Sequence, residues 1–196
     1  MKVTNLSKTN KIKKKENFKI IIQVRLSSSR LPKKVLKKIY RNQSMLEFLL
    51  NRLSKKFKKE DIIIALAKDK MNLPIMKILN KYEIKYFEGS ENNVLSRYYR
   101  CAQKFKVDNI IRITADCPFV DPFYADKIVD KYLETNADLI RQFDLPHGVF
   151  SYGVKVEALR KVVQMKDSSE TEVWGHYFTD TGIFNVIDLD VEDMKA

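Results

Sequence analysis

The stretch from Gln23 to Leu36 reads QVRLSSSRLPKKVL and brings two arginines, two lysines and three serines into the ten residues 25–34. Guanidinium and ammonium groups beside hydroxyls can bind phosphate through charge-assisted hydrogen bonds. A Walker-type loop would instead need glycines whose backbone amides wrap the phosphate, and no glycine occurs between Lys19 and Ser44. The stretch therefore indicates an anion site built from side chains, with a solvated basic loop as the alternative.

A second candidate group is the carboxylate of Asp116, in the segment RITADCPFVDP (112–122). Magnesium typically takes one or two protein carboxylates together with substrate phosphates and waters, so a lone Asp facing a phosphate site suits Mg²⁺. The alternative is a turn residue, which is common for Asp near proline, and Asp121 is expected to cap the following helix. Cys117 has neither of the two histidines near it in sequence, so we do not expect a catalytic thiol.

Alternating strands and helices are predicted to position these two loops. Continuous apolar runs indicate buried strands at 18–24, 61–67, 84–89, 108–115 and 137–143. Apolar residues at helical spacing indicate helices at 44–57 (with Ser44 as the N-cap), 71–83, 91–105 and 121–135. This order predicts an α/β fold with a mostly parallel sheet and helices on both faces. Ligands of such sheets bind beyond the carboxyl ends of the strands, where we expect the loops 25–34, 88–93 and 114–121.

The alternation stops after the fifth predicted strand. A short helix is expected near 156–165, and the segment 170–189 is expected to hold another helix and a late strand. We interpret 18–196 as a single domain in which residues 144–196 form a divergent acceptor-side region, either a lid or an added strand pair. Residues 1–17 are polar and basic and are predicted to be a flexible tail.

Composition and charge disfavour several classes of protein. An apolar share of 44% in 196 residues suits a globular domain, and no apolar run approaches the length of a membrane span. Cys101 and Cys117 indicate neither a disulfide framework nor metal-ligand spacing, which favours a cytoplasmic protein. Residues 1–60 hold 19 of the 37 Lys and Arg but 3 of the 25 Asp and Glu. The resulting positive field favours polyanions, whether nucleotide or nucleic acid.

Three motifs resemble those of the cytidylyltransferases of the acylneuraminate and spore-coat-polysaccharide type. QVRLSSSRLPKKVL is similar to the family's QARxxSxRLPGKxL, EGSENNVLSRYY to G-S-x-x-D-V-L-x-R-Y, and RITADCPFVDP to R-x-T-A-D-C-P-L-x-D-P. They occur in family order and at family spacing. The resemblance implies a glycosyltransferase-A-like fold, as in the nucleotide-diphospho-sugar transferases, and a Mg²⁺-dependent enzyme that transfers CMP from CTP to an acidic sugar, releasing pyrophosphate. A homodimer is a candidate assembly, and neither a membrane nor a specific nucleic acid is an expected partner.

The resemblance also implies roles for particular side chains. The nucleotide-binding residues would be Arg25, Ser28, Arg30, Lys34, Arg97 and Thr114. The catalytic set would be Arg30, Lys34 and Asp116, with Asp116 as the Mg²⁺ ligand. The loop 88–93 would lie near the nucleoside.

Several residues depart from the family pattern. Ser27 and Lys33 stand where glycine is common, and Asn93 stands where Asp is common. Phe150 replaces a late acid that helps to bind metal in the family, and Asp144 is the nearest acid to it in sequence. The acceptor motif of the family is also divergent here, and the chain ends early for the family.

Two other interpretations of the sequence stay open. One is a sugar-nucleotide-binding relative, either a glycosyltransferase or a catalytically degenerate member of the family. The other is a nucleic-acid-binding protein, which only the basic N-terminal third favours. No recognition-helix motif, aromatic RNP-like strand or zinc-ligand spacing supports that reading.

Overall fold

The computed structural model describes residues 18–28, 31–142, 144–165 and 175–190. Arg30 and the predicted tail, residues 1–17, lie outside these described residues. Within them, every strand and helix that the sequence predicts has a counterpart, although the ends differ by a few residues.

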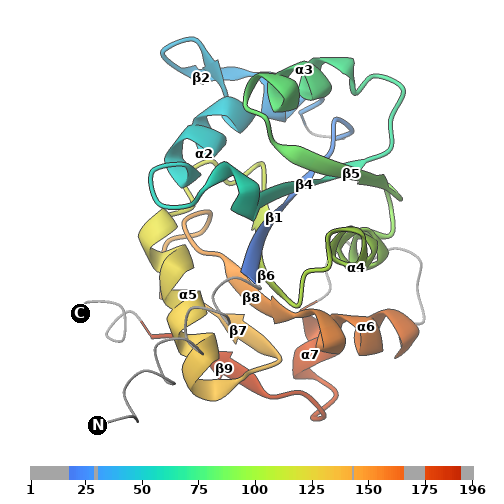
Figure 1. The fold of residues 1–196 in the computed structure, drawn as a ribbon, viewed down its shortest axis with the longest axis vertical. Helices are drawn as coiled ribbons and strands as arrows, with labels where there is room; N and C mark the ends of the chain where they lie inside the picture. The colour runs from blue at the N-terminus through green and yellow to red at the C-terminus, as the bar shows by residue number, and fades with distance from the viewer. Residues whose placement is uncertain (1–17, 29–30, 143, 166–174, 191–196) are drawn as a thin grey trace, which may run out of the picture.

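In the described part of the chain, seven strands form one sheet in the order β5-β4-β1-β6-β8-β7-β9 (Figure 1). Named in that order, they are β5 (Lys85–Gly89), β4 (Ile62–Ala67), β1 (Phe18–Val24), β6 (Asn109–Thr114), β8 (Tyr152–Lys155), β7 (Leu139–Arg141) and β9 (Val186–Asp188). Strand β1 pairs in parallel with both β4 and β6, and the pairs β4–β5 and β7–β9 are also parallel. Strand β8 is antiparallel to both of its neighbours, β6 and β7. The prediction of a mostly parallel sheet is confirmed.

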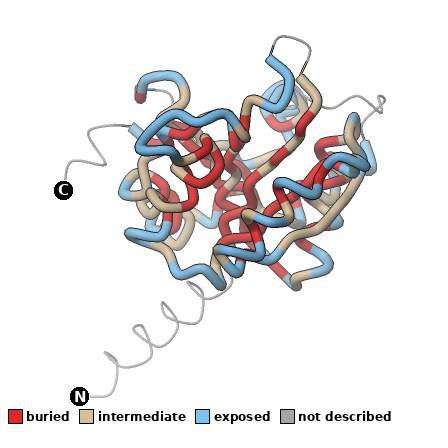
Figure 2. The backbone as a smooth tube through the Cα atoms, turned by 90° about the horizontal axis from the view of Figure 1, so that it is seen from above, coloured by how far each residue is buried: buried red, intermediate tan, exposed pale blue. Residues whose placement is uncertain are grey.

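The alternation of side chains along the strands divides the core between the two faces of the sheet. In β1, Ile20 and Ile22 pack into one apolar cluster and Ile21 packs into the other. The first cluster is covered by α2 (Met45–Leu53), α3 (Leu73–Lys81) and α5 (Pro122–Thr135). The second is covered by α4 (Val94–Phe105), α6 (Val156–Met165) and α7 (His176–Thr179). Figure 2 shows the buried residues gathered in the middle of the molecule.

Side-chain caps determine where two helices begin. Ser44 Oγ accepts the backbone N–H of Glu47 (3.3 Å), and Glu47 Oε2 accepts the backbone N–H of Ser44 (2.9 Å), so α2 starts with a capping box. Asp121 Oδ1 accepts the backbone N–H of Phe123 (2.8 Å) at the start of α5. Both caps lie where the sequence predicts them.

A small hairpin between β1 and α2 was not predicted. Its strands are β2 (Lys38–Tyr40) and β3 (Gln43–Ser44). Arg41 and Asn42 between them have φ angles of 42° and 61°, as the central residues of a type I′ turn require. The strands are too short to show an apolar alternation, so the sequence pattern does not reveal them. A short 3-10 helix, η2 (Lys59–Asp61), lies directly before β4.

The late region joins the main sheet instead of forming a separate layer. Strands β8 and β9 lie on either side of β7, and the expected late helices are present as α6 and α7. Strand β8 packs closely against α5 and β7 at Gly153. A Cβ atom at this position would lie 2.5 Å from Cγ2 of Ile128 in α5 and 3.2 Å from Cβ of Ile140 in β7. A glycine at this position therefore permits the close approach of helix and strand.

Candidate active site

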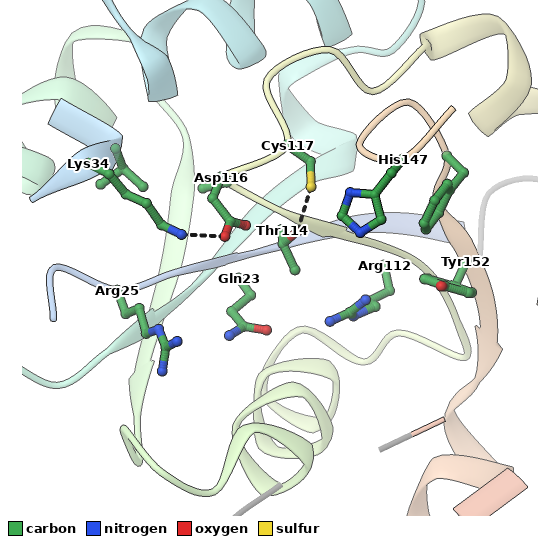
Figure 3. Close-up of a pocket in the computed structure, with 12 residues that line it drawn as sticks. Gln23, Arg25, Lys34, Arg112, Thr114, Asp116, Cys117, His147 and Tyr152 are labelled. Atoms are coloured by element: carbon green, nitrogen blue, oxygen red, sulfur yellow. Dashed lines mark hydrogen bonds and ion pairs between the residues drawn. The ribbon is translucent and has the colours of Figure 1, made fainter. Parts of the chain in front are cut away.

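The chain changes direction across the sheet at β1. It runs from β1 outward through β4 to β5 and then returns to β6 on the other side of β1. In open α/β sheets, ligands bind at the carboxyl ends of the strands at such a switch point. A cavity of about 260 Å³ lies there, beside β8 (Figure 3). Its lining residues are Gln23, Arg25, Lys34, Val35, Arg112, Thr114, Ala115, Asp116, Cys117, His147, Phe150 and Tyr152.

An ion pair between Lys34 and Asp116 joins the first loop to the loop after β6. Lys34 Nζ lies 2.5 Å from Asp116 Oδ2, although 82 residues separate the two in sequence. Lys34 begins the 3-10 turn η1 (Lys34–Leu36), and Asp116 follows the end of β6 by two residues. The predicted phosphate-binding loop and the predicted metal ligand therefore meet in one site.

Lys33, immediately before η1, has a backbone conformation that favours glycine. Its φ of 56° and ψ of 27° are left-handed, and a non-glycine residue adopts this conformation at a cost of roughly 1–2 kcal/mol. This gives a physical reason for the glycine that the resemblance places here. The backbone N–H of Lys33 donates to the carbonyl oxygen of Leu26 (2.9 Å) and closes the loop. The lysine side chain is exposed, so it does not crowd the core.

Asp116 is held in its ionised form. Burial opposes ionisation, but the hydrogen bond and the charge of Lys34 lower the pKa of Asp116 below its ordinary value. The side chain remains 41% exposed, so a ligand in the cavity can reach the carboxylate. An ionised, accessible carboxylate among cations that suit phosphate fits a Mg²⁺ ligand.

Four of the predicted site residues line the cavity together, namely Arg25, Lys34, Thr114 and Asp116. Ser28 is not one of the described lining residues, and its Oγ accepts the backbone N–H of Leu31 (3.3 Å) within the loop. Arg30 lies outside the described residues. The functional roles of all these side chains remain predictions.

Arg97 holds the loop after β5. Its side chain is fully buried, and Nη1 donates to the carbonyl oxygens of Ser90 (2.5 Å) and Glu91 (3.1 Å). Burial lowers the pKa of the guanidinium. Asn93 caps α4 by accepting the backbone N–H of Ser96 (3.0 Å), as an Asp could do equally well. The structure thus shows how this loop is shaped, and the contact of Arg97 with a nucleotide stays a prediction.

Sequence reasoning missed three lining side chains that stand beside the predicted Thr114, namely Gln23, Arg112 and Tyr152. Arg112 is paired with Tyr152 across β6 and β8, and Gln23 is paired with Thr114 across β1 and β6. Since Arg112 and Thr114 are two residues apart on one strand, all four side chains share one face of the sheet. That spacing within the RITADCP motif is the signal that could have identified Arg112. His147 comes from the irregular connection between β7 and β8, where the sequence offers no such signal.

Phe150 forms part of the wall where the resemblance suggests a second acid. Its ring lies edge-on to the rings of His147 and Tyr152, with centroid separations of 5.6 and 5.5 Å. Asp144 is exposed and does not line the cavity. The described residues contain no cluster of three or more His, Cys, Asp or Glu that could hold a metal ion. Among the described lining residues, Asp116 is the one carboxylate.

Cys117 lines the cavity as a neutral thiol. The hydroxyl of Thr114 donates to its Sγ (3.3 Å), and burial raises the pKa of the thiol. Because the thiolate is the nucleophilic form, this environment agrees with the expectation that the thiol is not catalytic.

Comparison with known proteins identifies the family. A family model described as cytidylyltransferase matches residues 19–178. This chain belongs to the cytidylyltransferase family. The matched residues include both loops that meet at the Lys34–Asp116 ion pair. The resemblance to the cytidylyltransferases that the three sequence motifs indicated is confirmed.

Relatives of this cytidylyltransferase-family chain include two longer proteins. An uncharacterized protein of Methanocaldococcus jannaschii is 37% identical over 141 residues, which cover 72% of this chain and 58% of that protein. The spore coat polysaccharide biosynthesis protein SpsF of Bacillus subtilis is 32% identical over 133 residues, which cover 66% of this chain and 55% of that protein. The chain thus spans little more than half the length of these curated relatives.

Solved structures confirm the nucleotidyltransferase fold of the cytidylyltransferase family. A cytidylyltransferase from Leptospira borgpetersenii matches with a TM-score of 0.82 at 23% identity, covering 92% of this chain and 78% of that one. A CMP:2-keto-3-deoxy-manno-octonic acid synthetase complexed with CTP matches with a TM-score of 0.71 at 14% identity, covering 88% and 90%. At these identities the likeness shows the fold alone.

None of the helices in the described part of the chain is long and apolar enough to span a membrane.

Proposed function

We propose that this protein is a Mg²⁺-dependent nucleotidyltransferase that transfers CMP from CTP to an acidic sugar, for the synthesis of a surface polysaccharide or glycan. The observation that carries the proposal is the meeting of Arg25, Lys34 and Asp116 in one cavity at the switch point of the sheet. Membership of the cytidylyltransferase family supports it. So do the relative named for spore coat polysaccharide biosynthesis and the fold neighbour that binds CTP.

In the proposed reaction an oxygen of the sugar attacks the α-phosphorus of CTP. The new O–P bond forms as the bond from the α-phosphorus to pyrophosphate breaks, and the attacking hydroxyl gives its proton to water or to pyrophosphate. Negative charge grows on the phosphoryl oxygens and on the leaving group. Arg25 and Lys34, with Ser28 and Arg30 of the same loop, would hold these oxygens and stabilise the charge. The reaction needs no covalent bond to the protein.

Asp116 would hold the Mg²⁺ ion. When bound, the ion would neutralise charge on the phosphates and help to orient them. Because Asp116 is the one carboxylate in the described lining, we expect phosphate oxygens and waters to complete the coordination. Mg²⁺ should therefore bind tightly only together with the triphosphate.

A second candidate function is sugar-nucleotide binding without transfer. Phe150 favours it, because an aromatic ring stands where the resemblance suggests an acid for a second metal ion. Such a protein would bind CTP or a CMP-sugar but would release no pyrophosphate. The homodimer and the cytoplasmic location stay predictions, and chromatography with light scattering would test the first of them.

A thermal-shift panel of CTP, UTP, ATP and GTP, each with Mg²⁺ or with EDTA, tests the proposal. A ligand that binds the folded protein raises its melting temperature, and we expect the largest rise with CTP and Mg²⁺. Equal rises for all four nucleotides would indicate a phosphate site without base selection, and no rise would contradict nucleotide binding. Pyrophosphate release on adding an acidic sugar then separates the enzyme from the non-catalytic relative.

A further inference from the structure

The hairpin of β2 and β3 projects from the body of the molecule beyond α2 (Figure 1). Two large side chains of this hairpin, Ile39 and Tyr40, are 40% and 49% exposed, and Phe119 in the loop after β6 is 58% exposed. Single exposed apolar side chains are common on protein surfaces. A contiguous group of them with polar residues at its rim marks an interaction surface.

Aromatic contacts make this group contiguous. The ring of Phe48 in α2 lies edge-on to the rings of both Tyr40 and Phe119, with centroid separations of 5.7 and 5.8 Å. The guanidinium carbon of Arg41 lies 5.1 Å from the ring centroid of Tyr40, a distance at which a cation and an aromatic ring attract each other. The strip of rings therefore runs from the hairpin to the loop after β6 and carries a cation at its hairpin end.

The hairpin is positively charged. Lys37, Lys38 and Arg41 are all exposed, and residues 31–46 include no Asp or Glu. The carboxylates beside the strip are paired with cations, because Glu47 binds Lys81 (3.0 Å) and lies 3.7 Å from Lys38. Asp121 likewise lies 3.7 Å from Arg52. We use the name hairpin face for the exposed side chains of Lys37, Lys38, Ile39, Tyr40, Arg41 and Phe119.

The chemistry of the hairpin face matches the surface of an anionic bilayer. Lys and Arg side chains are attracted to anionic headgroups, and aromatic and aliphatic side chains enter the interface between headgroups and acyl chains. A second copy of this chain would instead bring like charges together, which disfavours contact between two hairpin faces.

The shape of the hairpin also favours a lipid surface over a rigid partner. Ile39 and Tyr40 are neighbours on β2, so their side chains point to opposite faces of the hairpin. A folded protein that covers one face would leave the other apolar side chain in water. A fluid interface can surround a projecting hairpin on both faces.

We propose that the hairpin face docks on an anionic membrane surface, with Ile39, Tyr40 and Phe119 in the headgroup region and the three cations on lipid phosphates. The sequence predicts no membrane partner, because no apolar run is long enough to span a bilayer. Contact with the surface alone needs no such run. This inference goes beyond the proposed function and does not depend on it.

Co-sedimentation of the full chain with lipid vesicles tests the inference. The probe is a vesicle of equal parts phosphatidylcholine and phosphatidylglycerol, and a vesicle of phosphatidylcholine alone is the comparison. We expect binding to the anionic vesicle only, and weaker binding at high salt because the charges are then screened. Binding to neither vesicle, or to both equally, would overturn the inference.

Removing the cations of the hairpin face tests the role of charge. The variant combines Lys37→Gln, Lys38→Gln and Arg41→Gln. Each cation near an anionic surface strengthens binding roughly fivefold, so this variant should bind on the order of 100-fold more weakly. The matched control removes the same charge from exposed lysines on β5, after α4 and on α6, through Lys85→Gln, Lys106→Gln and Lys161→Gln. It should bind as the wild type does, and an equal loss in both variants would show that net charge alone attracts the protein, contrary to the inference.

Tyr40→Ser tests the apolar contact. Since the half-exposed ring would leave water on docking, its loss should weaken vesicle binding about tenfold and should leave the dependence on salt in place. Phe119→Ser serves if the first variant unfolds the hairpin, which a melting curve detects. Ile183→Ser removes an exposed apolar side chain outside the hairpin face and should change nothing. Unchanged binding of both Tyr40→Ser and Phe119→Ser would contradict insertion into the interface.

Binding of other ligands separates the inference from its alternatives. If the wild type binds single-stranded oligouridylate but not the anionic vesicle, the hairpin face is a nucleic-acid surface and the inference is wrong. The hairpin-face variants should bind CTP as the wild type does, because none of the changed residues lines the cavity. Failure of the wild type to bind CTP would contradict the proposed function, whereas the vesicle assay contains no nucleotide and decides the inference by itself.

Discussion

Replacing Lys34 by alanine should separate nucleotide binding from stability. The ammonium of Lys34 pairs with Asp116 at 2.5 Å, and the two side chains are 25% and 41% exposed. An exposed ion pair contributes about 0–1 kcal/mol, so the free energy of unfolding should fall by about 1 kcal/mol at most. A charged hydrogen bond to phosphate contributes about 1.5–3 kcal/mol. The affinity for CTP should therefore fall about 10- to 100-fold while the melting temperature changes little.

Calorimetric titration with CTP and Mg²⁺, together with melting curves, measures both quantities. Lys38→Ala is the matched control, because Lys38 is exposed and its ammonium lies 3.7 Å from the carboxylate of Glu47, outside the cavity. This control should bind CTP as the wild type does, and Arg30→Ala should behave like Lys34→Ala. If Lys38→Ala weakens CTP binding as much as Lys34→Ala does, the loop is a diffuse basic patch and the reasoning is wrong.

Three further predictions concern the metal, the tail and acid stability. Asp116→Asn should keep most of the affinity for CTP in EDTA and lose the increase caused by Mg²⁺, because the amide keeps the shape without the charge; an unchanged Mg²⁺ effect in paired titrations would place the metal elsewhere. Deleting residues 1–16 should leave the melting temperature and the CTP affinity unchanged, since charges ahead of the first strand are screened at physiological salt, and loss of the fold would show that a structural element had been taken for a tail. The backbone hydrogen bond from Ser44, assisted by Lys81, lowers the pKa of Glu47 to about 2 from a usual value of 4.5. Its stabilisation is thus complete above the unfolded-state pKa and is lost as the pH falls toward the folded-state pKa. Glu47→Gln should flatten the decline of melting temperature between about pH 5 and pH 2, and an unchanged decline would contradict this role for Glu47.

The order of strands and helices can be read from this sequence because the signals are local. A strand buried on both faces is a continuous apolar run, as in FKIIIQV and DIIIALA, and the helices between the strands repeat apolar residues at their own spacing. Ser44 and Asp121 mark helix starts because a cap acts on residues two or three positions away. Local order also indicates which loops lie at the carboxyl edge of the sheet, so Lys34 and Asp116 could be expected on the same side of the molecule.

Contacts between distant segments required the tertiary structure. Nothing local predicts that β8 enters between β6 and β7, because a four-residue strand has too little pattern of its own and gains its place by packing Gly153 under α5. That insertion brings Tyr152 beside Arg112 and Phe150 into the wall of the cavity. In the same way, the burial of Arg97 depends on how α4 packs against the sheet and on the carbonyls of a loop that the helix itself supports. The sequence by itself determines which segments form buried strands, amphipathic helices and turns, because those signals act over a few residues. Which segments pack against one another was decided by the tertiary structure, because such contacts join residues that lie far apart in the chain.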